Sequence, residues 1–198
     1  MKIIECVQKT PEWYSARCGM PTASSFDKII TSEGKQSKQR TKYIYQVAGE
    51  SITGVPEETY QSGAMLRGVE MEAEARAYYS LVNDTDIQQV GFCISEDIQC
   101  GASPDGLIGE RGLIEIKCPN LATHVGYLLE GKLPTDYFQQ VHGELFVTDR
   151  DWCDFVSYYP GIRPFILRVK RDDVFIEQLS KELKLFCQEL NLVIGKIK

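Results

Sequence analysis

Residues 112–118, with the sequence GLIEIKC, form a short and largely apolar segment between turn-rich stretches. Such a segment is typical of a buried β-strand, and strand geometry places Glu115 and Lys117 on one face because side chains alternate. Asp105 lies upstream in a Ser-Pro-Asp-Gly segment that favours a turn. The chain must therefore fold so that two carboxylates and one ammonium group converge on one point.

This convergence favours a metal-dependent phosphodiester nuclease. Oxygen ligands suit a hard cation such as Mg²⁺, which lowers the pKa of a bound water and offsets charge on the scissile phosphate, and a lysine can hold that water or phosphate. The alternative is that an isolated Glu-x-Lys pair is only a solvated face. The upstream Pro104-Asp105 dipeptide favours the nuclease.

The composition is that of one globular domain, because the chain has 198 residues, of which 43% are apolar and 25% charged. The apolar runs are too short to cross a bilayer, and the first residues lack the apolar core of a signal peptide. We therefore expect a soluble, intracellular protein. Seven cysteines without a C-x-x-C pair predict reduced, mostly buried thiols rather than disulfides or an iron–sulfur cluster.

The net charge of −6 is unfavourable for a nucleic-acid enzyme, because phosphate contacts normally come from a surplus of lysine and arginine. Basic residues must therefore be concentrated locally. Residues 35–42 and 163–171 are two stretches rich in lysine and arginine. Each could be a solvated face, or could line a basic channel in an acidic exterior.

Hydrophobic periodicity and turn residues predict helices, then strands, then helices along the chain, without repeats. Helices are expected at about 13–18, 23–30 (with Thr22 as N-cap), 37–49, 61–81, 120–130, 135–148 and from 173 onward, the last capped by Asp172. Strands are expected at about 87–94, 98–102, 113–118, 154–159 and 164–170.

Two polar side chains lie on or beside apolar helix faces. The apolar stripe of the helix 61–81 includes Glu72 together with Met65 and Tyr79. Glu72 therefore either faces the core for a functional reason or lies on a slightly rotated surface, and the spacing leaves both open. Gln140 borders the inward stripe of a later helix.

The order of these motifs resembles the PD-(D/E)XK nuclease superfamily, and more closely the lambda exonuclease or YqaJ-like viral recombinase family. Four segments carry the resemblance in the core: Gly68-x-x-x-Glu72, Ser103-Pro104-Asp105-Gly106, Glu115-Ile116-Lys117-Cys118-Pro119 and Gln139-Gln140-Val141. A fifth, W-x-x-x-R-x-G-x-x-T-A-S, spans residues 13–24. The resemblance extends from residue 13 to about residue 170.

The resemblance implies an α/β fold (α+β-like) with a restriction-endonuclease-like PD-(D/E)XK core, in which helices flank a central mixed β-sheet. It also implies one nuclease domain over residues 1–198. The core of that domain would lie at about 61–170, after an N-terminal helical part at 1–60 and before a C-terminal helix at about 173–196.

The activity that the resemblance implies is that of an alkaline-type exodeoxyribonuclease that uses Mg²⁺, with Mn²⁺ as a substitute. Such an enzyme digests one strand of linear double-stranded DNA in the 5′-to-3′ direction from a 5′-phosphorylated end. It releases mononucleotides and leaves a 3′ overhang for single-strand-annealing recombination. Family members form homotrimeric rings and work with a single-strand annealing protein, so the resemblance further implies a phage or prophage function in the bacterial host cytoplasm.

Carried over by position, the resemblance makes Asp105 and Glu115 metal ligands and adds the backbone carbonyl of Ile116. Lys117 would orient the nucleophilic water. A further acidic residue of the family corresponds here to Ser95, which leaves open whether one or two ions bind.

Other positions receive roles from the same resemblance. Glu72 would complete the acidic cluster and could contact the metal, and Gln140 would help to position the water or the phosphate. Arg17, with Ser24 near it, would hold the terminal 5′-phosphate, since the planar guanidinium pairs bidentately with phosphate oxygens. Met65 is the candidate for parting the strands at the duplex end.

Two other functions remain open at this stage. The chain could be another PD-(D/E)XK DNA endonuclease or repair nuclease, which would cut a covalently closed circle. It could also be a catalytically inactive DNA-binding module, although the intact Asp105, Glu115 and Lys117 argue against this. The two histidines, His124 and His142, are expected to be structural or surface residues.

Overall fold

The computed structural model describes residues 1–57 and 63–198, with the side chains of the second range from residue 71 onward. Its centre is a five-stranded sheet with the order β2 (Ile87–Gln88), β5 (Gly106–Ile108), β6 (Gly112–Lys117), β7 (Trp152–Ser157) and β8 (Phe165–Lys170). Strands β6 and β7 are parallel, whereas the other neighbours are antiparallel. The expected α/β fold with a central mixed sheet is confirmed.

A smaller antiparallel sheet joins β1 (Lys2–Ile4), β3 (Phe92–Ile94) and β4 (Gly101–Ala102). The prediction of a single strand at 87–94 is wrong, because the two ends of this segment form two strands, β2 and β3, that pair in different sheets. Gly91 lies between them, where an added Cβ would be 2.6 Å from the Ile4 carbonyl oxygen, so the chain there passes directly against β1. The sequence did not predict β1 and β5, which are too short to show a period.

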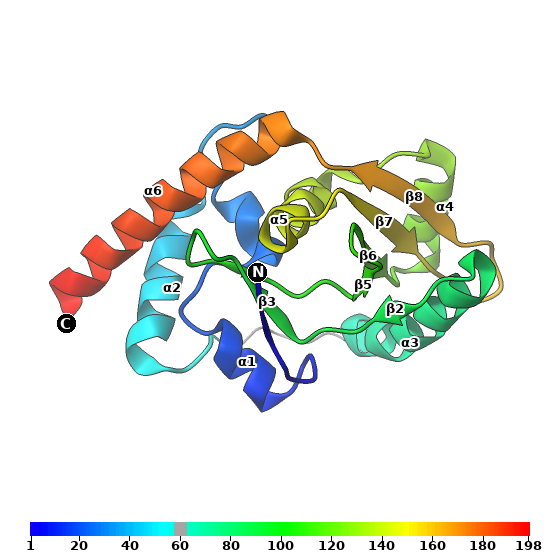
Figure 1. The fold of residues 1–198 in the computed structure, drawn as a ribbon, viewed down its shortest axis with the longest axis horizontal. Helices are drawn as coiled ribbons and strands as arrows, with labels where there is room; N and C mark the ends of the chain where they lie inside the picture. Colours follow the sequence, from blue (N-terminus) through cyan, green and yellow to red (C-terminus); the bar gives the residue numbers. More distant parts are fainter. Residues whose placement is uncertain (58–62) are drawn as a thin grey trace.

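Helices lie around both sheets, as Figure 1 shows. Helix α5 (Phe138–Thr148) contacts β3, β4 and β7 and therefore lies between the two sheets, while α3 (Gly63–Asn83) packs on β6. The chain runs from β6 to the parallel β7 through α4 (Leu121–Glu130), the 3₁₀ helix η2 (Thr135–Tyr137) and α5. The remaining helices are α1 (Pro11–Arg17), the 3₁₀ helix η1 (Ala23–Lys28), α2 (Arg40–Thr53) and α6 (Asp173–Ile197), which lies along α2.

Strand β6 is buried on both faces, and its alternation separates the two hydrophobic clusters of the protein. Ile114 and Ile116 pack with Met71 and Tyr79 of α3 in the smaller cluster. Leu113 belongs to the larger cluster, which includes residues of α5. Glu115 and Lys117 therefore lie on the α5 side, as the period of two requires.

The apolar stripe predicted for α3 is displaced by one position. The buried side chains of its described part are Met71, Ala75 and Tyr79, at intervals of four residues. Glu72 lies beside this stripe and is partly exposed, so its position is a border between core and surface. Met65 belongs to α3 by its backbone, but its side chain lies outside the described residues.

Helix ends follow the sequence at some positions and depart from it at others. The predicted N-cap Asp172 is confirmed, because its carboxylate accepts a hydrogen bond of 3.0 Å from the backbone N–H of Phe175. Thr22 also occupies the predicted N-cap position, before the 3₁₀ helix η1, but its side chain makes no capping hydrogen bond. The Thr22 hydroxyl instead accepts a hydrogen bond from Arg17 at 3.4 Å.

The basic stretch 35–42 is not one exposed face. Arg40 is only 5% exposed and forms ion pairs with Glu182 at 3.2 Å and Glu189 at 3.1 Å, which tie α2 to α6. The stretch 163–171 is also partly neutralised, since Arg168 and Arg171 each pair with an aspartate.

The seven cysteines are free thiols, as predicted. Cys93, Cys100 and Cys153 are buried, and the other four are partly buried. Among the described residues, none of the helices is both long and apolar enough to cross a membrane.

Candidate active site

The Pro104-Asp105-Gly106 turn connects β4 to β5 and places the Asp105 carboxylate against β6. One carboxylate oxygen accepts a hydrogen bond of 2.6 Å from the backbone N–H of Ile116. Gly106 follows directly because an added Cβ there would be 2.1 Å from a side-chain carbon of Ile87. The turn and the strand therefore meet at the position that the sequence pattern predicted.

Glu115, Lys117 and Gln140 form a closed hydrogen-bonded group between β6 and α5. Glu115 is 2% exposed, and its Oε1 atom lies 2.6 Å from both Lys117 Nζ and Gln140 Nε2. The amide oxygen of Gln140 accepts a hydrogen bond of 3.3 Å from Lys117 Nζ. The second carboxylate oxygen of Glu115 is buried and has no hydrogen-bond partner among the described residues.

The charged groups at this site shift one another's pKa values. Burial raises the pKa of Asp105 well above its usual value, and the nearby Glu115 and Glu72 carboxylates add to the effect. Burial alone would lower the pKa of Lys117, but Glu115 and Asp105 outweigh it and raise that pKa. The two carboxylates therefore favour the ammonium form of Lys117.

Glu72 of α3 joins the same acidic region and is held by two cations. Its two oxygens lie 2.7 Å from Arg76 Nη2 and 2.7 Å from Lys9 Nζ. Arg76 also donates a hydrogen bond of 3.2 Å to the backbone carbonyl of Asp105. Arg76 thereby links the helix that carries Glu72 to the turn that carries Asp105.

Sequence reasoning missed Glu144, which lies one helical turn after Gln140 on α5. Glu144 is 1% exposed, and its Oε1 atom accepts a hydrogen bond of 3.0 Å from Gln140 Nε2. Its other oxygen is buried without a partner among the described residues. Burial, with the nearby Glu115, raises the pKa of Glu144 well above its usual value. The spacing of four residues on one helix face was the signal that could have revealed it.

Arg17, at the end of α1, lies against the Ser103-Pro104-Asp105 turn. Its guanidinium carbon stacks 3.9 Å from the centre of the Trp13 ring, and it donates hydrogen bonds to the hydroxyls of Ser103, Thr22 and Ser24 at 3.2–3.4 Å. The indole N–H of Trp13 donates to the same Ser103 hydroxyl at 2.8 Å. In the part of the chain that the structure describes, the hydrogen-bond partners of Arg17 are hydroxyl groups rather than carboxylates.

One pocket of about 600 Å³ joins the two groups of residues. Arg17 and Ser24 line it together with Ile116, Lys117 and Glu72. The rest of its described lining includes four aromatic residues, two lysines and two glutamates: Trp13, Tyr14, Tyr43, Tyr137, Lys9, Lys28, Glu50 and Glu57. Among the described lining residues, four basic side chains (Lys9, Arg17, Lys28 and Lys117) meet three acidic ones (Glu50, Glu57 and Glu72), so the pocket is nearly balanced in charge although the whole chain is acidic.

The oxygen ligands at this site fit a hard cation. Within the described ranges, no three His, Cys, Asp or Glu side chains form a ready-made metal cage. Magnesium sites often use one or two carboxylates and leave the remaining positions to water. Asp105 and Glu115 supply such a pair, and the unpartnered buried oxygen of Glu115 gains a partner when a cation binds.

Comparison with known proteins identifies the family. Residues 12–151 match the model of the YqaJ-like viral recombinase domain, which is most of the chain. The chain belongs to this family. An uncharacterized protein of Acanthamoeba polyphaga mimivirus is 25% identical over 93% of this chain, and the chain spans only 35% of that longer protein.

Solved structures agree with the YqaJ-like assignment. The alkaline exonuclease LHK-Exo from Laribacter hongkongensis superimposes with a TM-score of 0.87 and 37% sequence identity, and the match covers 95% of this chain and 96% of that one. A complex of LHK-Exo with dAMP gives the same TM-score. A phage-related exonuclease from Haemophilus somnus has a TM-score of 0.74 at 16% identity over 93% of this chain and 99% of that chain, which shows a common fold. These similarities support an exonuclease of the lambda type.

Ser95 occupies the position at which the family resemblance implies a further acidic residue. Ser95 lies in the turn after β3, and its backbone N–H donates to the Cys100 carbonyl at 3.0 Å. Its acidic neighbour Glu96 pairs with the N-terminal amine at 2.9 Å. The carboxylate of Glu96 therefore pairs with the N-terminal amine and not with the group around Asp105.

The histidines are structural, as expected. His124 is fully buried, and its ring nitrogens lie 2.8 Å from the Ser157 hydroxyl and 3.0 Å from the Arg163 carbonyl oxygen. His142 packs edge-on against Phe138 with ring centres 4.4 Å apart. Neither ring forms a hydrogen bond to the acidic group of the site.

Proposed function

We propose that this chain is a divalent-metal-dependent exonuclease that digests one strand of linear double-stranded DNA in the 5′-to-3′ direction. It starts from a 5′-phosphorylated end, releases mononucleotides and leaves a 3′ single-stranded overhang for single-strand-annealing recombination. The observation that carries this proposal is the pocket in which Arg17 and Ser24 face the same space as Lys117 and Ile116. A terminal phosphate bound at the first pair brings the adjoining nucleotide toward the second.

Asp105, Glu115 and the Ile116 carbonyl are the proposed metal ligands, with Glu72 as an additional one. When Mg²⁺, or Mn²⁺ in its place, is bound there, as one or two ions, it lowers the pKa of a coordinated water and offsets charge on the phosphate. Burial and the neighbouring carboxylates raise the pKa of Asp105, and a cation would offset the repulsion among these carboxylates, so the acidic residues themselves favour its binding. Glu115 is already oriented by its two hydrogen-bonding neighbours.

Lys117 and Gln140 are the proposed positioning groups for the reaction. Glu115 and Asp105 favour the ammonium form of Lys117, and this ammonium can hold the attacking water or a phosphate oxygen. Gln140 presents its amide N–H groups to carboxylates and its oxygen to Lys117. This arrangement fixes the direction of the amide and leaves the lysine aimed at the pocket.

Arg17 and Ser24 are the proposed binding group for the terminal 5′-phosphate. A guanidinium that stacks on Trp13 and whose hydrogen-bond partners among the described residues are hydroxyls keeps its charge available for an anion. Burial lowers the pKa of Arg17, so the free site bears a desolvation cost that a bound phosphate offsets. Met65 of α3 is proposed to part the strands at the duplex end.

The similar proteins support the proposed exonuclease function. LHK-Exo is an alkaline exonuclease, and its complex contains dAMP, a deoxynucleoside monophosphate of the kind that digestion to mononucleotides yields. We propose that residues 1–198 act as one nuclease domain, with its core at about 61–170. We also propose a homotrimeric ring, a single-strand annealing protein as partner, and the bacterial host cytoplasm as the location.

The decisive experiment compares DNA ends. Linear duplex with a 5′-phosphate should be degraded in Mg²⁺, the same duplex with a 5′-hydroxyl should be degraded more slowly, and a covalently closed circle should stay intact. Arg17→Ala should reduce the difference between the two linear substrates to near zero. Cleavage of the circle would instead indicate an endonuclease, and no cleavage of any substrate would indicate a DNA-binding module.

The same substrates test the direction of digestion. A label at the 5′ end should be released first as a mononucleotide, while a label at the 3′ end stays in a long product. Equal rates from both linear substrates in the unaltered protein would contradict the role proposed for Arg17.

A further inference from the structure

The turn at Val7–Thr10, just before the region that the family model matches, holds Lys9 in an unusual conformation. Lys9 has a φ of +68°, in the left-handed region that glycine adopts readily and that other side chains rarely adopt. The turn is closed by the Thr10 hydroxyl, which donates to the Val7 carbonyl at 2.7 Å. Strained backbone of this kind often marks a functional side chain.

Gln8 attaches this turn to the catalytic loop. Its amide nitrogen donates hydrogen bonds of 3.0 Å to the carbonyls of both Val90 and Pro104. Pro104 directly precedes Asp105, so the position of the turn is linked to that of the proposed metal ligand. Lys9 therefore has a defined location relative to the site.

The ammonium of Lys9 reaches the wall of the pocket. It lies 2.7 Å from Glu72, yet Glu72 already has a second cation in Arg76 at the same distance. The side chain of Lys9 is 37% exposed, compared with 15% for Arg76. Arg76 is thus the buried partner of Glu72, whereas Lys9 is the cation that solvent and ligands can approach.

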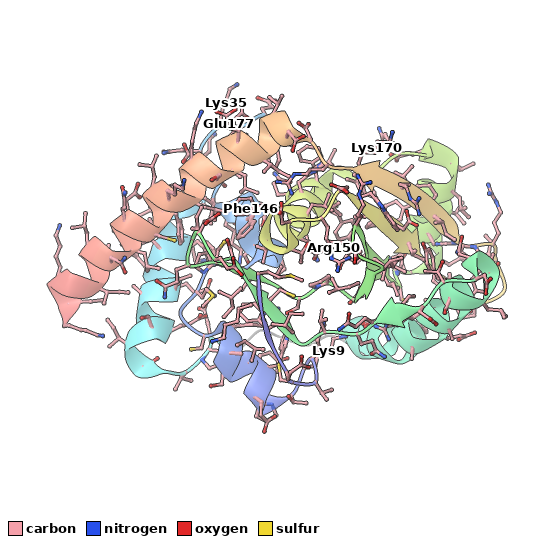
Figure 2. All side chains as sticks on the ribbon, in the orientation of Figure 1. Lys9, Lys35, Phe146, Arg150, Lys170 and Glu177 are labelled. Carbon is pink, nitrogen blue, oxygen red and sulfur yellow. The ribbon has the colours of Figure 1, made fainter. Side chains whose placement is uncertain are left out.

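The surroundings of Lys9 match those of the other proposed phosphate-binding groups. Lys9 lines the same pocket as Arg17 and Lys117. In Figure 2 it lies between α1, which carries Arg17, and α3, which carries Glu72. A nucleotide strand that passes from the terminal-phosphate group to the hydrolytic centre would have its backbone within this pocket.

We propose that Lys9 binds a backbone phosphate of the DNA strand in this pocket, so that the turn 7–10 is a substrate-binding element of the enzyme. This inference rests on the proposed nuclease function. It adds to that function a substrate-binding residue, Lys9, that lies before the residues 12–151 matched by the family model. The ion pair with Glu72 holds the free ammonium near the strand path. When DNA binds, Arg76 continues to balance Glu72 while Lys9 contacts the phosphate.

The test measures binding of a 5′-phosphorylated duplex by fluorescence anisotropy in EDTA, at several KCl concentrations, on the full chain. Lys9→Gly removes the ammonium and relieves the backbone strain, and Lys9→Gln removes the charge alone. Both should bind about tenfold more weakly at low salt. Both should also reduce the slope of log affinity against log salt by about one, as expected for one lost phosphate contact. Lys9→Arg should restore both values.

Lys181→Gln is the matched control. Lys181 also pairs with a glutamate, Glu177, at 2.8 Å, but both lie exposed on α6. Figure 2 shows Glu177 at the upper edge of the view, whereas Lys9 lies in its lower half. The control should keep the affinity and the salt slope of the unaltered protein.

The outcomes separate this inference from the proposed function. If the unaltered protein degrades the duplex in Mg²⁺ but the Lys9 variants keep the full salt slope, Lys9 is only a structural partner of Glu72 and the inference fails alone. If the unaltered protein neither binds nor degrades the duplex, the proposed function fails and the inference fails with it.

Discussion

Glu144→Gln should make the protein more stable at neutral and alkaline pH. Glu144 is 1% exposed, one of its oxygens has no partner among the described residues, and Glu115 adds repulsion. A buried polar atom without a partner costs roughly 1 to 3 kcal/mol, and more when it is charged. Glutamine keeps the oxygen that accepts from Gln140 and puts a neutral amide nitrogen in place of the unpartnered oxygen, so it removes the buried charge and its repulsion from Glu115, and we expect a gain of about 1 to 2 kcal/mol.

The gain should depend on pH in a defined direction. Burial raises the pKa of Glu144 in the folded protein above its usual value of 4.5. A carboxyl group with a raised folded pKa favours folding below the unfolded pKa and loses that contribution as the pH rises toward the folded pKa. The variant lacks this loss, so its advantage should be absent near pH 4 and present at pH 8.

Urea unfolding at pH 4, 6 and 8 measures both the gain and its pH dependence. Thermal unfolding gives a second measure, since 1 kcal/mol corresponds to about 2–4 °C in a domain of this size. Glu177→Gln is the control, because Glu177 is exposed and Lys181 lowers its pKa, so that variant should gain no stability. A variant at Glu144 that is less stable than the unaltered protein at pH 8, or a gain equal at pH 4 and 8, would refute the reasoning.

Three further predictions address the site and the core. Lys117→Met should reduce cleavage at least a thousandfold, because the positioned ammonium is lost, and gel assays should show this while anisotropy still detects bound DNA. Arg76→Met should lower kcat by a factor about ten times larger than the factor by which it changes KM, since Glu72 and the Asp105 carbonyl lose their common partner. A change confined to KM would contradict this. Burial lowers the pKa of His142, so the unfolded chain takes up its proton more readily and stability falls as the pH drops below about 6.5. His142→Leu should show a smaller loss of Tm between pH 7.5 and 5.5, and an equal loss would exclude His142 as a cause.

The candidate site could be predicted where its residues are close in sequence. Glu115 and Lys117 share a face because strand alternation is a local property. Asp172 caps α6 for an equally local reason, since its carboxylate bonds the N–H three residues onward. The Pro-Asp-Gly turn was recognised by its composition, and the structure places its carboxylate against β6.

Local patterns failed where the neighbours are distant in sequence. The segment 87–94 has a strand composition throughout, but pairing with β1 and β5 divides it between two sheets. The stripe on α3 was displaced because its spacing alone does not show which side β6 covers. Arg40 was taken as part of a basic stretch, although Glu182 and Glu189 bury it against α6.

The sequence by itself determined which side chains are candidates for the active site of this protein, the order of its motifs and most of its helices and long strands. Only the tertiary structure decided that the buried Glu144 accepts a hydrogen bond from Gln140 and that Arg76 joins Glu72 to the Asp105 turn. It also decided that Lys9 lines the same pocket as Arg17. The physical reason is that periodicity and capping act over a few residues, whereas burial and ion pairing depend on segments that meet only when the chain has folded.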